Sequence, residues 1–272
     1  MKEWLIDPLL SLVGKFAGPS PGASDWSIII PVKDQPELTA RCFDSVLRNA
    51  ADAEIIAVND ASEEAETAAV LSRFESSGGI VISNSQAEGH TRATHRGVDI
   101  STRPLLCLLN NDTVLTASAL TLLGAALDEA TVGSTGPTTS RCATEQTNSY
   151  AEWRRWKWTD QEIDGFSTYM RRRCRNQFAD LDYVGGFAFC IRREVWDQFG
   201  GFNLRLPDYG NEKELCKRLA NSGLKQRWVK DAYVHHLGNA SYGQYGDDEV
   251  KRLRRRGEEI MRSLPSRCES LT

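Results

Sequence analysis

The chain has 272 residues, of which 40% are hydrophobic and 26% charged, and its formal net charge is -4 at pH 7. This length allows one large domain or two small ones with an ample core, and we expect one. The acidic balance argues against a general nucleic-acid-binding protein, which needs clustered positive charge. The seven cysteines form no CxxC pair and several lie in apolar runs, so we expect reduced, buried thiols and a cytoplasmic protein.

The first 24 residues are expected to form an amphipathic segment and a linker. Residues 1–16 place Trp4, Leu5, Leu9 and Leu12 at near-helical spacing, and the GPSPGAS stretch that follows breaks any helix. This segment either packs on the domain or makes a peripheral contact with a membrane, and its balanced charges favour packing. We expect neither a membrane span nor a signal peptide, because no run approaches roughly 20 apolar residues and the residue pattern of a leader is missing.

From residue 26 onward, short apolar runs alternate with stretches that have helical spacing. The apolar runs predict strands at 26–32, 54–60, 79–85 and 104–112. The stretches between them predict helices at 36–50, 63–76 and 90–101. Three successive strand–helix units indicate an α/β fold with a doubly wound, mostly parallel sheet.

Polar residues stand at the carboxyl end of each of the four predicted strands. They are Lys33 and Asp34, Asn59 and Asp60, Asn84 and Ser85, and Asn110, Asn111 and Asp112. Any one of these groups is typical of an Asx turn. Because the carboxyl ends of parallel strands meet at one edge of a sheet, their recurrence favours a ligand crevice, and the oxygen donors of the last group suit Mg²⁺ or Mn²⁺. No GxGxxG, GxxxxGK[ST] or GxSxG motif occurs, which argues against Rossmann dehydrogenases, P-loop proteins and serine hydrolases.

Several segments, in order, resemble the inverting nucleotide-sugar glycosyltransferases of family 2, which have the GT-A fold. They are SIIIPVKDQPEL, EIIAVNDAS, EGHTRATHRG, LLNNDTVL, YVGGFAFCIRREVWDQFGGFN, PDYGNEKELCKRLANSGL and VHHLGNAS. The resemblance runs from about residue 26 to 242. It implies one GT-A domain at 25–243, with a mixed, mostly parallel sheet and flanking helices. Residues 25–115 would form the nucleotide-binding half, 116–243 the acceptor half, and 244–272 a charged helix or tail.

The same resemblance implies a nucleotide-diphosphate sugar as donor and a divalent cation, Mn²⁺ or Mg²⁺. The implied metal ligands are Asp112, Asn110 and His236. The implied donor-binding residues are Pro31, Lys33, Asp34, Asp60, Arg92, Asn110 and Asn111. The implied catalytic base is Glu212. His235 alternates to the other face of its strand and is not the expected ligand.

The chain departs from the family pattern at several of these positions. Asn59 stands where the family has the first Asp of its second segment, which leaves Asp60 near the base and ribose of the donor nucleotide. Asn110 stands where the family has the first Asp of its D-x-D motif, so the metal site carries one charge fewer. His95 stands where the family has Asn. Asn211 and Glu212 replace a Glu-Asp pair.

The residues around Glu212 predict how its helix begins. Asn211 fits an N-cap and Glu214 the third position of a capping box, with Leu215 and Leu219 buried and Gly223 ending the helix. This assigns Glu214 to structure and leaves Glu212 as the base, with Asp208 as the substitute. In the alternative interpretation, Glu212 only stabilises the helix dipole.

A glycan, a lipid-linked sugar and a small molecule are the three candidate sources of the acceptor hydroxyl. The expected role is the synthesis of a glycan or a cell-surface polysaccharide. The stretch 147–178 holds Trp153, Trp156, Trp158 and seven basic residues, and forms either a flap over the cleft or a basic helix with tryptophans packed inward. Two rival functions remain. A nucleotidyltransferase is disfavoured because PVKDQPEL lacks glycine and arginine, and a nucleic-acid-binding module would use the basic and aromatic stretch 153–175.

Overall fold

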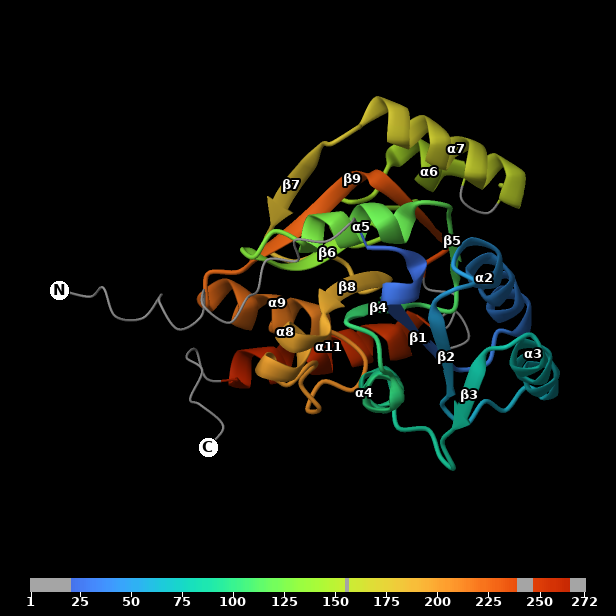
Figure 1. Cartoon of the computed structure of the whole chain (residues 1–272). Coiled ribbons are helices and arrows are strands. Elements are labelled where there is room, and N and C mark those ends of the chain that lie inside the picture. Colours follow the sequence, from blue (N-terminus) through green and yellow to red (C-terminus); the bar gives the residue numbers. More distant parts are fainter. Residues whose placement is uncertain (1–20, 155–156, 239–246, 265–272) are drawn as a thin grey trace.

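The computed structural model describes residues 21–154, 157–238 and 247–264 (Figure 1). In this part of the chain nine strands form one sheet in the order β3-β2-β1-β4-β8-β6-β9-β5, and β7 pairs with β9 off this path. The strands are β1 (Trp26–Val32), β2 (Glu54–Asn59), β3 (Ile80–Ser83), β4 (Leu105–Leu109), β5 (Thr113–Leu115), β6 (Val132–Thr138), β7 (Phe178–Leu181), β8 (Ala188–Arg192) and β9 (Lys225–His236). The helices are η1 (Ala23–Asp25), α2 (Pro36–Asn49), α3 (Ala65–Ser76), α4 (His90–Ile100), α5 (Ala119–Leu127), α6 (Ser149–Arg154), α7 (Asp160–Arg173), α8 (Arg193–Phe199), α9 (Asn211–Asn221) and α11 (Asp247–Ser263).

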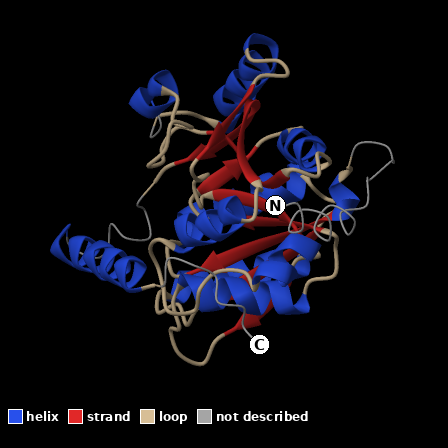
Figure 2. Ribbon diagram, turned by 90° about the vertical axis from the view of Figure 1, so that its left-hand side faces the viewer, coloured by secondary structure: helices blue, strands red, loops and turns tan. Residues whose placement is uncertain are grey.

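The first half consists of the parallel strand–helix units that the sequence predicts. β1 pairs in parallel with β2 and β4, and β2 pairs in parallel with β3. Helices cover both faces of this sheet (Figure 2). Ile28 and Ile30 pack on one face with Phe43 of α2, while Ile29 packs on the other with Val98 of α4. Burial on both faces explains why β1 is a continuous apolar run and does not alternate.

The second half makes the sheet mixed. β8 is antiparallel to both β4 and β6, β6 and β9 are parallel, and β9 is antiparallel to β5 and β7. The expected α/β fold with a mixed sheet and flanking helices is therefore confirmed. No helix in the described ranges combines the length and apolar character needed to cross a membrane.

The basic and aromatic stretch forms α6 and α7, which lie together beyond β9 (Figure 1). Trp158 is buried and stacks on the His235 ring with 5.6 Å between the centroids. The Arg41 guanidinium of α2 donates to the Trp158 carbonyl at 2.9 Å and to Asp160 at 2.8 Å, which holds the start of α7. At Trp158 the structure therefore shows inward packing. Residues 1–16, for which packing or a membrane contact was predicted, lie outside the described residues. The same holds for Trp156 and for the side chain of Trp153.

Candidate active site

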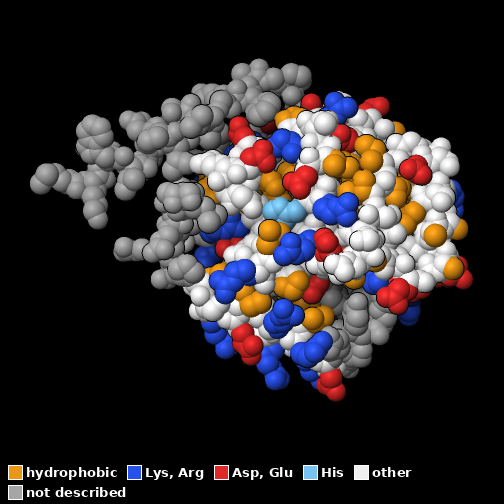
Figure 3. Space-filling view, turned by 90° about the horizontal axis from the view of Figure 1, so that it is seen from below, with side chains coloured by type: hydrophobic (Ala, Val, Ile, Leu, Met, Phe, Trp, Pro, Cys, Tyr) orange, Lys and Arg blue, Asp and Glu red, His pale blue; other side chains and the backbone are white. Residues whose placement is uncertain are grey.

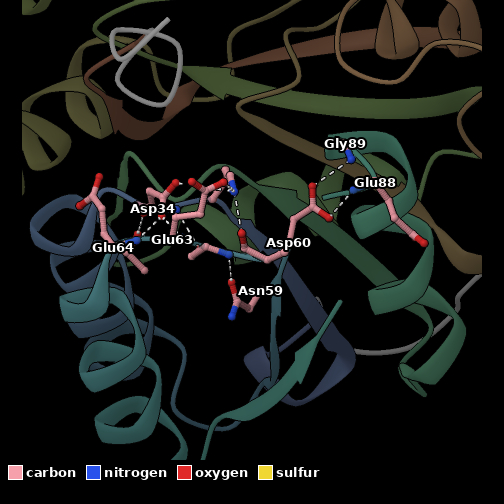
Figure 4. A network of polar contacts seen from close by, with 11 residues as sticks. Asp34, Asn59, Asp60, Glu63, Glu64, Glu88 and Gly89 are labelled. Atoms are coloured by element: carbon pink, nitrogen blue, oxygen red, sulfur yellow. Dashed lines mark hydrogen bonds and ion pairs between the residues drawn. The ribbon is translucent and has the colours of Figure 1, made fainter. Parts of the chain in front are cut away.

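Two aspartates that follow β1 and β2 hold the starts of the neighbouring helices (Figure 4). Asp34 Oδ1 accepts the backbone N–H groups of residues 63 and 64, at 2.6 and 2.9 Å, just before α3. The Asp60 carboxylate accepts those of residues 88 and 89, at 2.8 and 2.9 Å, just before α4. Both carboxylates satisfy N–H groups that a helix start leaves without partners. They therefore fix the loops along the edge where the nucleotide was predicted to bind.

The other predicted donor-binding residues lie in different surroundings. Lys33 donates to the Ala61 carbonyl at 2.6 Å, beside Asp34. Asn111 is buried, and its amide donates to Thr39 of α2 at 2.9 Å, so this side chain points into the protein. Arg92 is exposed on α4. Of the predicted donor residues, Pro31, Lys33, Asp34 and Asp60 thus share the ends of β1 and β2.

A cavity of about 710 Å³ lies next to this edge. It brings together Asn110, Asp112, His236, Asp208 and Glu212, which come from three separate parts of the chain. The lining does not include the predicted donor residues Pro31, Lys33, Asp34, Asp60, Arg92 and Asn111.

Asp112 and His236 form a close pair in this cavity. β5 and β9 are antiparallel with Thr113 opposite His236, and this register places the residue before β5 beside the end of β9. Asp112 Oδ1 lies 3.2 Å from His236 Nε2, and both side chains are buried. The other ring nitrogen, Nδ1, bonds the Arg141 carbonyl, and the imidazole stacks on Phe187. Burial alone lowers the pKa of His236, but the Asp112 carboxylate and the Arg141 carbonyl outweigh it, so the pKa is raised.

The pair fits a divalent cation. Ligands about 2.1 Å from an octahedral ion lie about 3 Å from their neighbours, close to the 3.2 Å between Asp112 Oδ1 and His236 Nε2. The Asn110 amide lines the same cavity. Among the residues that the structure describes, no three His, Cys, Asp or Glu side chains form a metal cluster. A cation here would therefore need substrate or water oxygens as further ligands, as Mg²⁺ usually does.

Helix α9 does not begin as the sequence predicts. Gly210, with φ of 91°, is the N-cap, and Asn211 is the first helical residue. The Asn211 amide is buried and donates to Thr91 of α4 at 2.7 Å. Glu214 receives two hydrogen bonds from Arg218, at 2.8 and 2.6 Å. The predicted capping box is therefore wrong, because Gly210 takes the left-handed turn into the helix and both polar side chains have tertiary or (i, i+4) partners.

Glu212 is partly buried on the cavity wall. A Cβ atom added at Gly186 would lie 3.4 Å from its carboxyl carbon, which is ordinary van der Waals contact and places Glu212 beside the 185–186 segment of the cavity wall. Burial raises the pKa of Glu212, opposed by the charge of Lys213. Burial also raises the pKa of Asp208, opposed by His90. Both acids thus have a pKa nearer neutrality than usual, which suits proton transfer.

One wall of the cavity has no counterpart among the predicted residues. Helix α11 contributes Arg254, Gly257, Glu258, Met261 and Arg262. A Cβ atom at Gly257 would lie 2.7 Å from the Tyr209 carbonyl oxygen, so only glycine lets α11 approach that loop. An isolated glycine within a charged helical stretch was the available signal for this contact. The sequence also gave no role to His90, Arg141, Tyr183 and Lys213, which line the same cavity.

The mixed, mostly parallel sheet with helices on both faces is the GT-A fold that the sequence predicted. The model of glycosyl transferase family 2 matches residues 27–199, more than half of the chain. The chain therefore belongs to glycosyl transferase family 2. No curated protein matches its sequence.

Three solved structures have a similar fold. The mannosyltransferase PcManGT from Pyrobaculum calidifontis, in complex with GDP-Man and Mn²⁺, aligns with a TM-score of 0.63 and 14% identity over 96% of this chain and 71% of its own. GalNAc-T7 with UDP, GalNAc and Mn²⁺ gives 0.59 and 16%, covering 78% of this chain and 43% of that one. S. aureus TarS 1-349 gives 0.58 and 11%, covering 81% and 62%. At these identities the likeness shows the fold.

Proposed function

We propose that the protein transfers a sugar from a nucleotide diphosphate to a hydroxyl group, with inversion at the anomeric carbon and with a divalent cation bound. The observation that carries this proposal is the cavity in which the Asp112–His236 pair and Glu212 meet, in a chain of glycosyl transferase family 2. Two of the similar structures contain Mn²⁺ together with UDP or GDP-Man, which supports the same chemistry here.

Asp112, His236 and the Asn110 amide would hold Mn²⁺ or Mg²⁺. When bound, such an ion offsets the negative charge that develops on a departing nucleotide diphosphate. His236 Nδ1 donates a hydrogen bond to the Arg141 carbonyl, which directs the lone pair of Nε2 toward the cavity. The nucleotide would bind along the ends of β1 and β2, at Pro31, Lys33, Asp34 and Asp60. Arg92, exposed on α4, and Asn111, whose amide bonds Thr39, complete the predicted set.

Glu212 would act as the base. Its carboxylate accepts the proton of the acceptor hydroxyl while the hydroxyl oxygen attacks the anomeric carbon from the side opposite the nucleotide. The raised pKa of Glu212 improves its capacity to accept that proton. Asp208, which lines the same cavity, is the substitute.

The acceptor classes of this proposal are glycans, lipid-linked sugars and small hydroxyl compounds. The proposed role is glycan or cell-surface polysaccharide synthesis, and the proposed location is the cytoplasm. Among the side chains of α6 and α7 that the structure describes, none lines the cavity.

A thermal-shift screen tests the proposal. UDP, GDP and dTDP are each added with and without Mn²⁺, because a ligand that binds only the folded state raises the melting temperature. We expect a metal-dependent rise with at least one nucleotide. A melting temperature that no nucleotide changes, with or without Mn²⁺, would count decisively against a nucleotide-sugar transferase.

A further inference from the structure

Helix α11 carries a dense block of positive charge in a chain whose net charge is -4. Five of the six residues from 251 to 256 are basic, and we call them the basic segment. All five side chains are exposed: Lys251, Arg252, Arg254, Arg255 and Arg256. Figure 3 shows Lys and Arg side chains gathered on the face seen from below, which includes α11.

The opposite side of α11 holds the helix against the body of the protein. Gly257 packs on the Tyr209 backbone, and a Cβ at Gly210 would lie 3.4 Å from Met261 Cγ. Leu253 and Ile260, at the same helical spacing, are partly buried. The helix thus has one face packed on the 209–210 loop beside Glu212, and its basic segment is directed largely to solvent.

Two ion pairs among the described side chains of α11 lie at its surface. Lys251 pairs with Asp248 at 3.4 Å, and Arg262 with Glu258 at 3.3 Å. These pairs are highly exposed, with 70% and 102% of the two side chains accessible in the first and 75% and 68% in the second. Exposed pairs of this kind contribute little and exchange readily for another anion.

We propose that the basic segment of α11 docks the protein on an anionic phospholipid surface. Four to eight basic residues on an amphipathic helix form the usual recognition element for such lipids. The segment contains no aromatic residue, whereas single-stranded nucleic acids are held by aromatic stacking between basic groups. Arg254 of the basic segment lines the cavity, as do Glu258 and Arg262 further along α11. Docking of the segment would therefore bring this wall of the cavity to the lipid surface. If the proposed glycosyl transfer holds, this placement selects a lipid-linked acceptor among the three open classes.

Vesicle sedimentation of the full chain tests the docking. The vesicles contain phosphatidylcholine alone or phosphatidylcholine mixed with phosphatidylglycerol. We expect binding to the mixed vesicles only, and release when the salt concentration is raised. The double variant Arg252→Glu/Arg255→Glu should bind the mixed vesicles at least ~10-fold more weakly. Neither residue lines the cavity, so its melting temperature and nucleotide response should match the wild type.

The matched control is Arg172→Glu/Arg173→Glu, which makes the same charge change on exposed residues at the end of α7. It should keep wild-type binding. The proposal would be overturned if the wild type did not bind mixed vesicles, or if the control variant lost as much binding as Arg252→Glu/Arg255→Glu. It would also be overturned if single-stranded DNA displaced the vesicles at a concentration below that of the accessible anionic lipid. No donor or acceptor is present, so the outcome is independent of the nucleotide screen and of the glycosyl transfer.

Discussion

Substitution by glutamine should have different effects at the two glutamates near the start of α9: it should lower the transfer rate at Glu212 and the thermal stability at Glu214. Glu212→Gln keeps the size of a side chain that lines the cavity but removes its capacity to accept a proton. We expect transfer to fall by roughly 10²–10⁴, the usual contribution of a general base, with nucleotide binding retained. Because burial raises the pKa of Glu212, its ionisation opposes folding, and this cost is present once the pH is above the raised value. At neutral pH the uncharged glutamine should therefore keep or raise the melting temperature.

Glu214→Gln should instead lower stability. Glu214 and Arg218 make two hydrogen bonds at 2.8 and 2.6 Å, and their side chains are only 9% and 19% exposed. The same guanidinium donates to the carbonyls of Phe199 and Gly201, which ties α9 to the end of α8. Glutamine keeps one acceptor oxygen but loses the charge, so we expect a cost of about 1–3 kcal/mol. In a chain of this size that lowers the melting temperature by roughly 2–4 °C per kcal/mol.

The assay combines single-turnover transfer at saturating donor, the nucleotide dissociation constant and thermal melting for the wild type and both variants. The expected result is a crossed pattern, in which Glu212→Gln loses transfer and Glu214→Gln loses stability, with transfer by the folded protein unchanged. Near-normal transfer by Glu212→Gln together with loss in Asp208→Asn would move the base to Asp208. If Glu214→Gln melted like the wild type, our account of the Arg218 contacts would be refuted.

Further predictions concern the metal, the pH profile and the nucleotide edge. Asp112→Ala should abolish the Mn²⁺-dependent part of nucleotide binding, whereas Asn110→Ala should only weaken it because a neutral amide contributes less, and His236→Ala should fall between them; titration with Mn²⁺ would expose the error if Asp112→Ala bound as the wild type does. Transfer by the wild type should fall on acidification through the raised pKa of Glu212, and a pH profile flat down to the ordinary value of 4.5 would be incompatible with this base. Asp60→Ala removes the acceptor of two backbone N–H groups and should cost about 1–3 kcal/mol in thermal melting; an unchanged melting temperature would show that these bonds add no net stability.

Local sequence patterns were sufficient for the first half of the fold. The predicted strands and helices there agree with β1 to β4 and α2 to α4 within a few residues, because apolar runs and polar strand ends are local signals. The close approach of Asp112 and His236 depends on the register between β5 and β9, which local patterns do not specify. The polar strand end had indicated Asp112, whereas His236 was predicted only through the motif resemblance.

Side-chain direction was less well predicted. Arg92 was assigned to the donor, yet Thr91, Thr94 and Val98 form the buried face of α4 and Arg92 lies off it, as the helical period would have shown. The motif resemblance assigned Asn111 to the donor, and in the structure its buried amide bonds Thr39. The wall made by α11 depends on packing between residues about fifty positions apart, at Tyr209 and Gly257; an isolated glycine indicates a close approach but does not specify the partner.

Asp60 combines a structural role with the binding role proposed for it. A carboxylate has about four acceptor positions. Oδ1 accepts from Asn84 at 2.6 Å and from Glu88 N at 2.8 Å, and Oδ2 accepts from Gly89 N at 2.9 Å. Among the hydrogen bonds of the described residues, these use three of the four positions, and the proposed contact with a donor group of a nucleotide would use the fourth, on Oδ2. Any variant of Asp60 therefore changes the start of α4 as well as the proposed nucleotide contact. A fall in nucleotide affinity identifies a direct contact only if the melting temperature without ligand is unchanged, which shows that the start of α4 is intact.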